Sequence, residues 1–136
     1  MKGNNMKLKI RNRQTTPGIV TMSPEGSIDV DTSSILDREL CRIIAENIKT
    51  LVLDMAGVDF ISSAGIGAVT KAKVTIKRQG GDIAMINVQP QVKTVFEIMR
   101  LGPVLNVFES IQELDEYLEK LQKRVVEEGT SISVDD

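Results

Sequence analysis

The alternation of apolar and charged positions near the N-terminus predicts two strands. Residues 7–13 place two aliphatic side chains between charged ones, as an exposed edge strand does. Residues 18–26 continue with an apolar run and reach the turn-forming residues Pro24 and Gly26. We therefore expect these segments to form an antiparallel pair, with the second strand ending at that turn.

The next segment has the periodicity of an amphipathic helix followed by a buried strand. Leucine and isoleucine recur at i, i+4, i+7 and i+8 from Leu36, which makes one apolar helix face. Asp31, Thr32 and Ser33 precede it, and all three are residue types that cap helix N-termini. Residues 49–55 follow, and their core of Leu51, Val52 and Leu53 has the continuous hydrophobicity that is typical of a strand buried on both faces.

The stretch FISSAGIG, residues 60–67, lies where this strand gives way to a second helix, and two adjacent serines mark the junction. From Ala64 onward an alanine recurs every four residues, a small-residue stripe that would let the helix lie close to the sheet. Gly80 and Gly81 are expected to end the helix. Residues 82–88 then alternate into another buried strand.

The C-terminal part predicts a helix, a short strand and a last helix. Pro90 opens the first helix near its first turn, and Gly102 and Pro103 are expected to end it. Residues 104–108 read as the strand, and Ser110 begins a capping box for the last helix. The predicted apolar face of that helix consists of Ile111, Leu114, Leu118, Leu121 and Val125.

The order of these elements, β-β-α-β-α-β-α-β-α, indicates an α/β fold. We expect a single domain with a mostly parallel mixed sheet of about five strands and about four helices packed against it. The domain would span residues 7–126, between a flexible N-terminus at 1–6 and a disordered acidic tail at 127–136. The pattern leaves open the order of the strands across the sheet.

Composition argues against a catalytic role for the two serines. The 136 residues include no histidine and one cysteine, so neither a Ser-His relay nor a histidine or cysteine metal cluster can form. A nucleophile at Ser63 would need an unusual lysine base, and the glycines lack the lysine that follows them in a phosphate-binding loop. Ser62 or Ser63 is therefore expected to cap the helix, a role that does not exclude modification, while Gly65 and Gly67 allow close packing.

Charge and hydropathy limit the partners that we expect. The net charge of -2 lacks the basic surplus of nucleic-acid-binding proteins. No apolar run approaches the roughly 20 residues of a membrane helix, and the N-terminus has no apolar signal segment. The single cysteine, Cys41, fits a reducing compartment and is expected to pack in the core. These features predict a cytoplasmic protein without nucleic-acid or membrane partners.

Two pairs of carboxylates, Asp29 with Asp31 and Asp54 with Asp59, lie at predicted turns and helix starts. Their spacing selects no metal ion, so we expect neither a metal nor a cofactor. They are interpreted as caps, solvated groups or parts of a recognition surface. The solvated face of the second helix is expected to carry its basic residues Lys71, Lys73, Lys77 and Arg78.

Several motifs match one known family in order. They are LVLDMAGVDFI as a strand, SAGIG as a helix start, GGDIAMINV as a strand and VFEIMRLGPVLNVFESIQEL as the ending. Earlier, GSIDVDTSSIL is similar to that family's turn before its first helix. Together they resemble the STAS domain family, and within it the free-standing anti-sigma factor antagonists. The resemblance covers about residues 7–125 and implies a STAS-type fold.

The resemblance also implies a site. In such antagonists a partner kinase phosphorylates a serine at this helix start, and aligning the glycines puts Ser63 at that position. Ser62 then stands where the family has an aspartate, and it is the alternative acceptor. The implied partner-binding residues are Asp29, Asp59, Ser62, Ser63, Ala64, Gly65 and Ile66.

The implied partners are an anti-sigma factor serine kinase and a serine phosphatase. The unphosphorylated bacterial protein would bind the kinase and so release a sigma factor, and the phosphatase would reset the phosphorylated form. ATP and magnesium would belong to the kinase, because the domain itself would be a substrate and binding module and not an enzyme. An alternative role is a STAS signalling or scaffold module in a partner-switching or transporter-associated pathway without a sigma factor.

Overall fold

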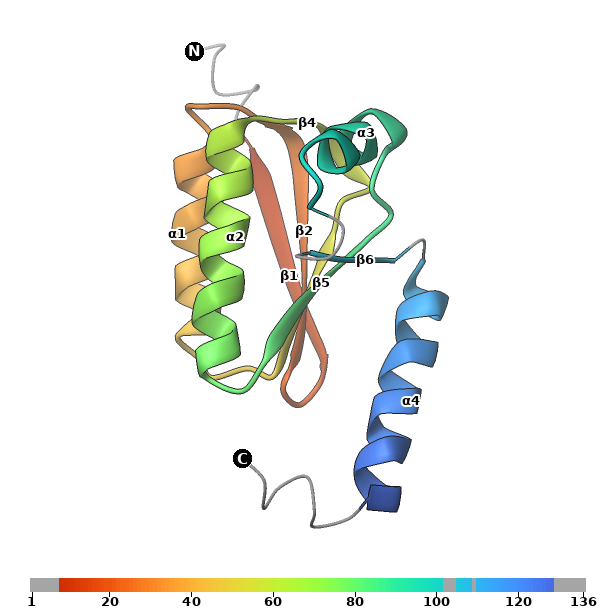
Figure 1. The fold of residues 1–136 in the computed structure, drawn as a ribbon. Coiled ribbons are helices and arrows are strands. Elements are labelled where there is room, and N and C mark those ends of the chain that lie inside the picture. Colours follow the sequence, from red (N-terminus) through yellow and green to blue (C-terminus); the bar gives the residue numbers. More distant parts are fainter. Residues whose placement is uncertain (1–7, 102–104, 109, 129–136) are drawn as a thin grey trace.

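A six-stranded sheet separates the helices of this protein into layers (Figure 1). The computed structural model describes residues 8–101, 105–108 and 110–128. The strands are β1 (Lys9–Thr16), β2 (Ile19–Ile28), β3 (Thr50–Asp54), β4 (Gly57–Ile61), β5 (Asp82–Ile86) and β6 (Asn106–Phe108). Their order is β1-β2-β3-β5-β6, with β4 paired to β2 off this path. β1 runs antiparallel to β2 as predicted, and the other pairings are parallel.

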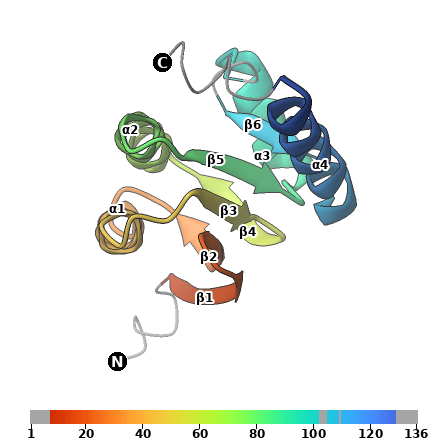
Figure 2. The same cartoon turned by 90° about the horizontal axis from the view of Figure 1, so that it is seen from below.

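The helices cover the two faces of the sheet unequally. They are α1 (Ser33–Ile44), α2 (Ser63–Arg78), α3 (Pro90–Ile98) and α4 (Ile111–Glu128). Figure 2 shows α1 and α2 side by side on one face and α4 on the other side, next to β5 and β6. α3 packs beside β4. This architecture confirms the predicted α/β class, a mostly parallel mixed sheet with helices packed against it.

Strand β3 supplies side chains to both apolar layers. Leu51 and Leu53 belong to the larger buried cluster, together with residues of α1 and α2. Val52 points to the opposite face and belongs to the smaller cluster, which includes Leu114 of α4. Because each face of the strand is covered, the strand reads as a continuous apolar run, and the prediction of burial on both faces is confirmed.

Strand β4 is an element that the apolar pattern did not reveal. It follows β3 after Met55 and Ala56 and pairs in parallel with residues 25–28 of β2. Asp59 and Phe60 are adjacent and both exposed, so the strand shows neither strict alternation nor a continuous apolar run. The stretch LVLDMAGVDFI, expected as one strand, is therefore two strands, and the sheet has one strand more than predicted.

Strand β2 continues through Pro24 and Gly26, so the prediction of a turn there was wrong. Residues 19–22 of β2 pair with β3 and residues 25–28 pair with β4. Within the described chain, Pro24 pairs with neither β3 nor β4, because it lies where β2 changes partners. Its missing N–H therefore breaks no hydrogen bond on that side of the strand.

The bend from α2 into β5 requires a glycine. A Cβ atom at Gly81 would lie 2.4 Å from the carbonyl oxygen of Lys49, and backbone cannot move away easily. Gly80 adopts a positive φ of 85°, which is the conformation expected after a helix C-terminus. The predicted end of α2 at these two glycines is confirmed, since the helix ends at Arg78.

The serine half of the capping box predicted for the last helix is present. The backbone N–H of Glu113 donates to Ser110 Oγ at 3.2 Å, and Leu114 is buried. α4 continues to Glu128, two residues into the segment predicted as a tail. α3 ends at Ile98, with Met99 as its C-cap, so it stops before Gly102 and Pro103, which were predicted to end it. The segments 1–6 and 129–136 and the side chains of Leu121 and Val125 lie outside the described residues.

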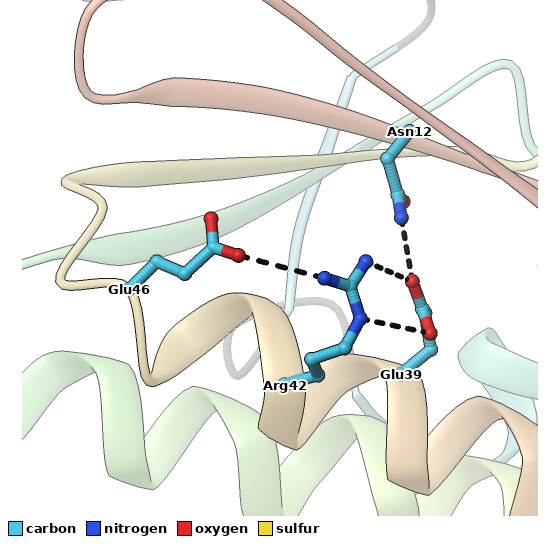
Figure 3. A network of polar contacts seen from close by, with 4 residues as sticks. All are labelled: Asn12, Glu39, Arg42 and Glu46. Atoms are coloured by element: carbon cyan, nitrogen blue, oxygen red, sulfur yellow. Dashed lines mark hydrogen bonds and ion pairs between the residues drawn. The ribbon is translucent and has the colours of Figure 1, made fainter.

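A polar network joins the edge strand β1 to α1 (Figure 3). Asn12 Nδ2 donates to the Glu39 carboxylate at 2.6 Å, and Arg42 donates to the same carboxylate. Arg42 also lies 3.5 Å from Glu46. The hydrogen bond from Arg42 lowers the pKa of Glu39.

Cys41, on the same helix, is exposed, so its predicted burial in the core was wrong. The apolar face of α1 does not include its position.

Candidate functional site

The two serines at the start of α2 have different environments. Ser62 is the N-cap, with φ -89° and ψ 170°, and its Oγ accepts a hydrogen bond from the backbone N–H of Gly65 at 3.2 Å. Ser63 is the first residue of the helix and is exposed. Within the described chain its hydroxyl makes no hydrogen bond. The capping role that the sequence left open between the two residues therefore belongs to Ser62.

Strand β2 holds this helix start in place. The backbone N–H of Ser62 donates to the carbonyl oxygen of Ile28 at 2.7 Å. A Cβ atom at Gly65 would lie 2.5 Å from Ile28 Cγ2 and 2.9 Å from an Ile61 side-chain carbon, so only glycine fits without movement. Gly65 and Ile66 are buried, whereas Ser63 and Ala64 face solvent. The first pair fixes the turn, and the second pair forms its surface.

Gly67 lies in open space. A Cβ atom built there would meet no atom within 4 Å, and the residue is exposed. The expectation that Gly67 allows close packing was therefore wrong. Glycine within a helix costs about 1 kcal/mol relative to alanine, so the fold alone does not explain this residue.

Asp29 caps the turn that leads into α1. Its Oδ1 accepts from the backbone N–H of Thr32 at 2.8 Å, and its own N–H donates to Thr32 Oγ1 at 2.9 Å. The backbone N–H of Ser33 donates to the carbonyl oxygen of Asp29 at 2.9 Å, which extends the helical pattern back to Asp29. The hydrogen bond from the Thr32 backbone lowers the pKa of Asp29. Asp31 and Thr32 were also expected to cap α1. The N-cap position belongs to Thr32, so Asp31 is not the cap, and the Thr32 side chain makes no capping hydrogen bond to the helix.

Ser27 connects the two predicted aspartates. Its Oγ donates to Asp59 Oδ1 at 2.7 Å, and its carbonyl oxygen accepts from Thr32 Oγ1 at 2.7 Å, next to Asp29. The Asp59 carbonyl oxygen also accepts from Gln91 of α3 at 3.1 Å. The end of β2 thus brings Asp29 and Asp59 to one end of the sheet, near Ser62. The sequence contains no signal for Ser27, because a lone serine in a strand is unremarkable.

Two large apolar side chains are exposed around the same end of the sheet. Val30 follows Asp29 and is 72% exposed, and Phe60 precedes Ile61 in β4 and is 51% exposed. We call Val30, Phe60, Ser63, Ala64 and Gly67 the switch surface. Val30 and Phe60 were not predicted, although an aromatic residue beside a polar turn is a signal that could have found one of them. Large apolar side chains that stay exposed can mark a binding surface.

A hollow of about 270 Å³ between α1 and α2 adjoins this surface. It is lined by Ser33, Ser34, Asp37, Ala64, Gly67, Ala68 and Lys71. Lys71 Nζ lies 2.9 Å from Asp37 Oδ1, and this hydrogen bond raises the pKa of Lys71. Ala64 and Ala68 line this hollow and Ala72 lines the next one along α1, so the alanine stripe faces the neighbouring helix.

The other charged groups singled out in the sequence have structural partners. Asp54 Oδ1 accepts from Asn87 Nδ2 and from the backbone N–H of Ala56, both at 3.1 Å. Lys73 and Lys77 of α2 pair with Asp82 at 3.0 and 3.6 Å, so these two lysines are not merely a solvated face. Among the described residues no group of three or more histidine, cysteine or acidic residues could hold a metal ion.

None of the described helices has the length and apolar character needed to cross a bilayer. The helix N-terminus at Ser63 carries free backbone N–H groups and partial positive charge, which favours an anionic group there. An anionic group on the exposed Ser63 hydroxyl would therefore lie at the favourable end of the helix dipole.

Comparisons with known proteins agree with this description. Residues 11–114 match the model of the STAS domain. The anti-sigma-F factor antagonist RsfB of Mycobacterium tuberculosis is 26% identical over 98 residues, which are 71% of this chain and 78% of RsfB. An anti-sigma factor antagonist from Mycobacterium paratuberculosis superposes with a TM-score of 0.72 at 18% identity, covering 85% of this chain and 95% of that one. The anti-sigma factor antagonist SpoIIAA of Bacillus, in its unphosphorylated form, gives 0.69 at 19% identity, covering 82% and 97%.

Proposed function

This chain belongs to the STAS domain family, and from that premise we propose that it is a phospho-regulated anti-sigma factor antagonist. Unphosphorylated, it binds an anti-sigma factor that is also a serine kinase, and the sigma factor held by that kinase is released. Phosphorylation of Ser63 ends the complex, and a serine phosphatase restores the binding form. The chain acts as substrate and binding module, in the cytoplasm, and ATP and magnesium are bound by the kinase.

The observation that carries this proposal is the difference between Ser62 and Ser63. A kinase needs an accessible hydroxyl, and Ser63 is exposed at the first position of α2 with no hydrogen bond in the described chain. Ser62 is half-buried, and its oxygen accepts the N–H of Gly65. A phosphate on Ser62 would have to replace this cap, whereas a phosphate on Ser63 leaves the cap in place.

The replacement of the family's aspartate by Ser62 is compatible with this function. Serine and aspartate both cap helix N-termini by accepting a backbone hydrogen bond, and Ser62 accepts one from Gly65. The helix start is therefore formed without the carboxylate. Without that carboxylate the unmodified surface carries one negative charge fewer than a surface with aspartate at this position. A phosphate at Ser63 is therefore a larger change relative to the unmodified charge.

The switch surface supports regulation by repulsion at an interface. Val30 and Phe60 are exposed apolar anchors, and Ala64 and Gly67 leave the first turns of α2 almost without side chains. A partner can pack closely on such a surface. Phosphorylation adds about 1.5 to 2 negative charges, which the helix N-terminus tolerates but a partner shaped for a neutral serine does not. Burying an unmatched charge is costly, so affinity falls without a change of fold.

Incubation with the cognate kinase and ATP, followed by mass-spectrometric mapping of the phosphosite, tests the proposal. We expect phosphate on Ser63 in the parent protein and none in Ser63→Ala. The matched variant Ser62→Ala should still accept phosphate on Ser63. Full phosphorylation of Ser63→Ala would refute the assignment of the acceptor.

A second experiment separates the sigma-dependent role from the scaffold role. Unmodified protein and Ser63→Asp are used as baits. For each bait we measure whether it captures the kinase, and whether the captured kinase has lost its sigma factor. We expect capture by the unmodified bait alone, with release of a sigma factor from the kinase. Capture of a partner that controls no sigma factor would favour a signalling or scaffold module instead.

A further inference from the structure

The face of the sheet opposite α1 and α2 is only half covered. α4 buries the side of this face formed by β3, β5 and β6, through contacts of Leu114 and Leu118 with Val52 and its neighbours. The side formed by β1 and β2 has no helix over it in the described chain (Figure 2). A groove of about 680 Å³ lies at the boundary, with residues of β1, β2, β3 and β5 and the first residue of α4 along its walls.

The register of the strands defines the polar positions in this groove. Arg11 of β1 lies opposite Ser23 of β2, and Arg13 lies opposite Thr21. Thr21 in turn lies opposite Val52 of β3, which places Asp54, two residues further on, on the same face. Two interstrand spacings separate the Cα atoms of Arg11 and Asp54, which is about 10 Å. Two arginines, with Glu25 beside Arg11, thus face the Asp54 carboxylate across one groove.

The charges at the two ends of the groove have different local partners. Arg13 makes no ion pair within the described chain, and Arg11 lies 3.5 Å from Glu25 in an exposed pair. At the other end, Asp54 is half-buried and is held through Oδ1 by Asn87 and the Ala56 N–H. This bonding fixes the carboxylate and uses one of its two oxygens, so an acceptor remains. Ile111 of α4 provides an apolar wall beside it.

We infer that this groove binds a small zwitterion, with a phosphate or carboxylate at Arg11 and Arg13 and an amino group at Asp54. Guanidinium groups bind both anions through paired N–H donors, and a fixed carboxylate accepts from an ammonium group. The groove volume lies within the range of small-molecule sites. Charged residues on β1 also protect an edge strand from pairing with other chains, but that role does not explain a carboxylate held in place two strands away.

This site is independent of the switch surface. α2, which carries Ala64 and Gly67, lies with α1 on the opposite face of the sheet from the groove (Figure 2). None of the residues in the switch surface lines the groove. The inference therefore does not rest on phosphorylation of Ser63.

Amide chemical-shift titration of the whole protein tests the inference, read at Gly57 and Asn87, two residues of the groove wall. The probes are O-phosphoethanolamine, γ-aminobutyrate and ethyl phosphate, each raised to about 20 mM, where a millimolar site is saturated. We expect saturable shifts with at least one of the two zwitterions. A response to the first alone identifies a phosphate ligand, and a response to the second alone identifies a carboxylate ligand.

Three variants separate a built site from chance binding. Arg13→Gln should weaken the zwitterion at least about ten-fold, and Asp54→Asn should weaken it at least about five-fold while leaving ethyl phosphate unchanged. Arg78→Gln, an exposed arginine of α2 outside the groove, is the matched control and should change nothing. The inference is overturned if no zwitterion gives saturable shifts, if Arg13→Gln binds as the parent does, or if ethyl phosphate loses affinity equally in Asp54→Asn.

Discussion

Ser62 Oγ accepts the backbone N–H of Gly65 at 3.2 Å, and this bond makes the two adjacent serines of the protein unequal. One serine completes the helix start and the other is left to solvent. Structure and regulation are thus assigned to neighbouring residues and do not compete for one hydroxyl. The same division leads to separable effects on stability and on modification.

Replacing the cap should cost stability, whereas replacing its neighbour should not. We expect Ser62→Ala to lower the free energy of unfolding by about 1 kcal/mol, because the Gly65 N–H loses its acceptor. Ser63→Ala should remain within about 0.5 kcal/mol of the parent, since Ser63 is exposed. Urea denaturation followed by circular dichroism measures both values. Ser62→Asp, which restores an acceptor, should recover most of the loss, and equal losses for the two alanine variants would contradict the assignment of the cap.

The two glycines of α2 should respond to alanine with opposite signs. Gly67→Ala should stabilise the protein by about 0.5–1 kcal/mol, because its Cβ enters open space and alanine favours helix. Gly65→Ala should destabilise it by about 1–3 kcal/mol, because the Cβ would overlap Ile28 and Ile61. Thermal and urea unfolding give both signs. A destabilised Gly67→Ala would show that the space beside α2 is not free.

Removing the apolar anchors should weaken partner binding without harming the fold. We expect Phe60→Ser or Val30→Ser to raise the Kd for the kinase about ten-fold, since exposed apolar anchors that become buried carry much of an interface's energy. Calorimetric titration measures the affinity, and unfolding curves confirm the fold. Val74→Ser is the matched control, because Val74 is 48% exposed but lies three helical turns further along α2. Similar losses in Val74→Ser would argue against the switch surface.

Acid should remove the contribution of the network between β1 and α1. The hydrogen bond from Arg42 lowers the pKa of Glu39 from its ordinary value of 4.5, so the folded state holds Glu39 ionised more strongly than the unfolded state does. The resulting stability is present above pH 4.5 and is lost as the pH falls through the lower folded value. Urea titrations at a series of acidic pH values should show this decline. Glu39→Gln should flatten it, and an unchanged slope in that variant would assign the decline to Asp29 and Asp82, whose pKa values are also lowered.

Periodic burial explains which elements the sequence predicts. α1 buries one stripe and β3 buries both faces, so each leaves a regular pattern in the apolar positions. Gly80 was predicted as a stop because glycine after a helix has a local cause, which is confirmed here by its positive φ of 85°. The fold class follows from the alternation of such elements.

Long-range pairing explains what the sequence does not predict. Pro24 reads as a turn residue, and only the change of partners along β2 shows why the strand continues. Ser27 has no local signal, because its importance comes from Asp59, a residue of another strand. Periodicity places Ser62 and Ser63 at a helix start, but their backbone geometry distinguishes the cap from the exposed hydroxyl.

The irregular pairing of β2 with β4 sets which side chain of β4 points outward. Val58 pairs opposite Gly26, and Phe60 pairs opposite Ser27, so Asp59 is an extra residue without a partner across the strand. Because of this extra residue, the alternation of inward and outward side chains along β4 shifts by one position after Asp59. Ile61 is therefore buried and Phe60 is exposed. In an unbroken strand the two would exchange places. The aromatic anchor of the switch surface therefore depends on a single inserted position, and a deletion of one residue could remove that anchor while keeping the strand.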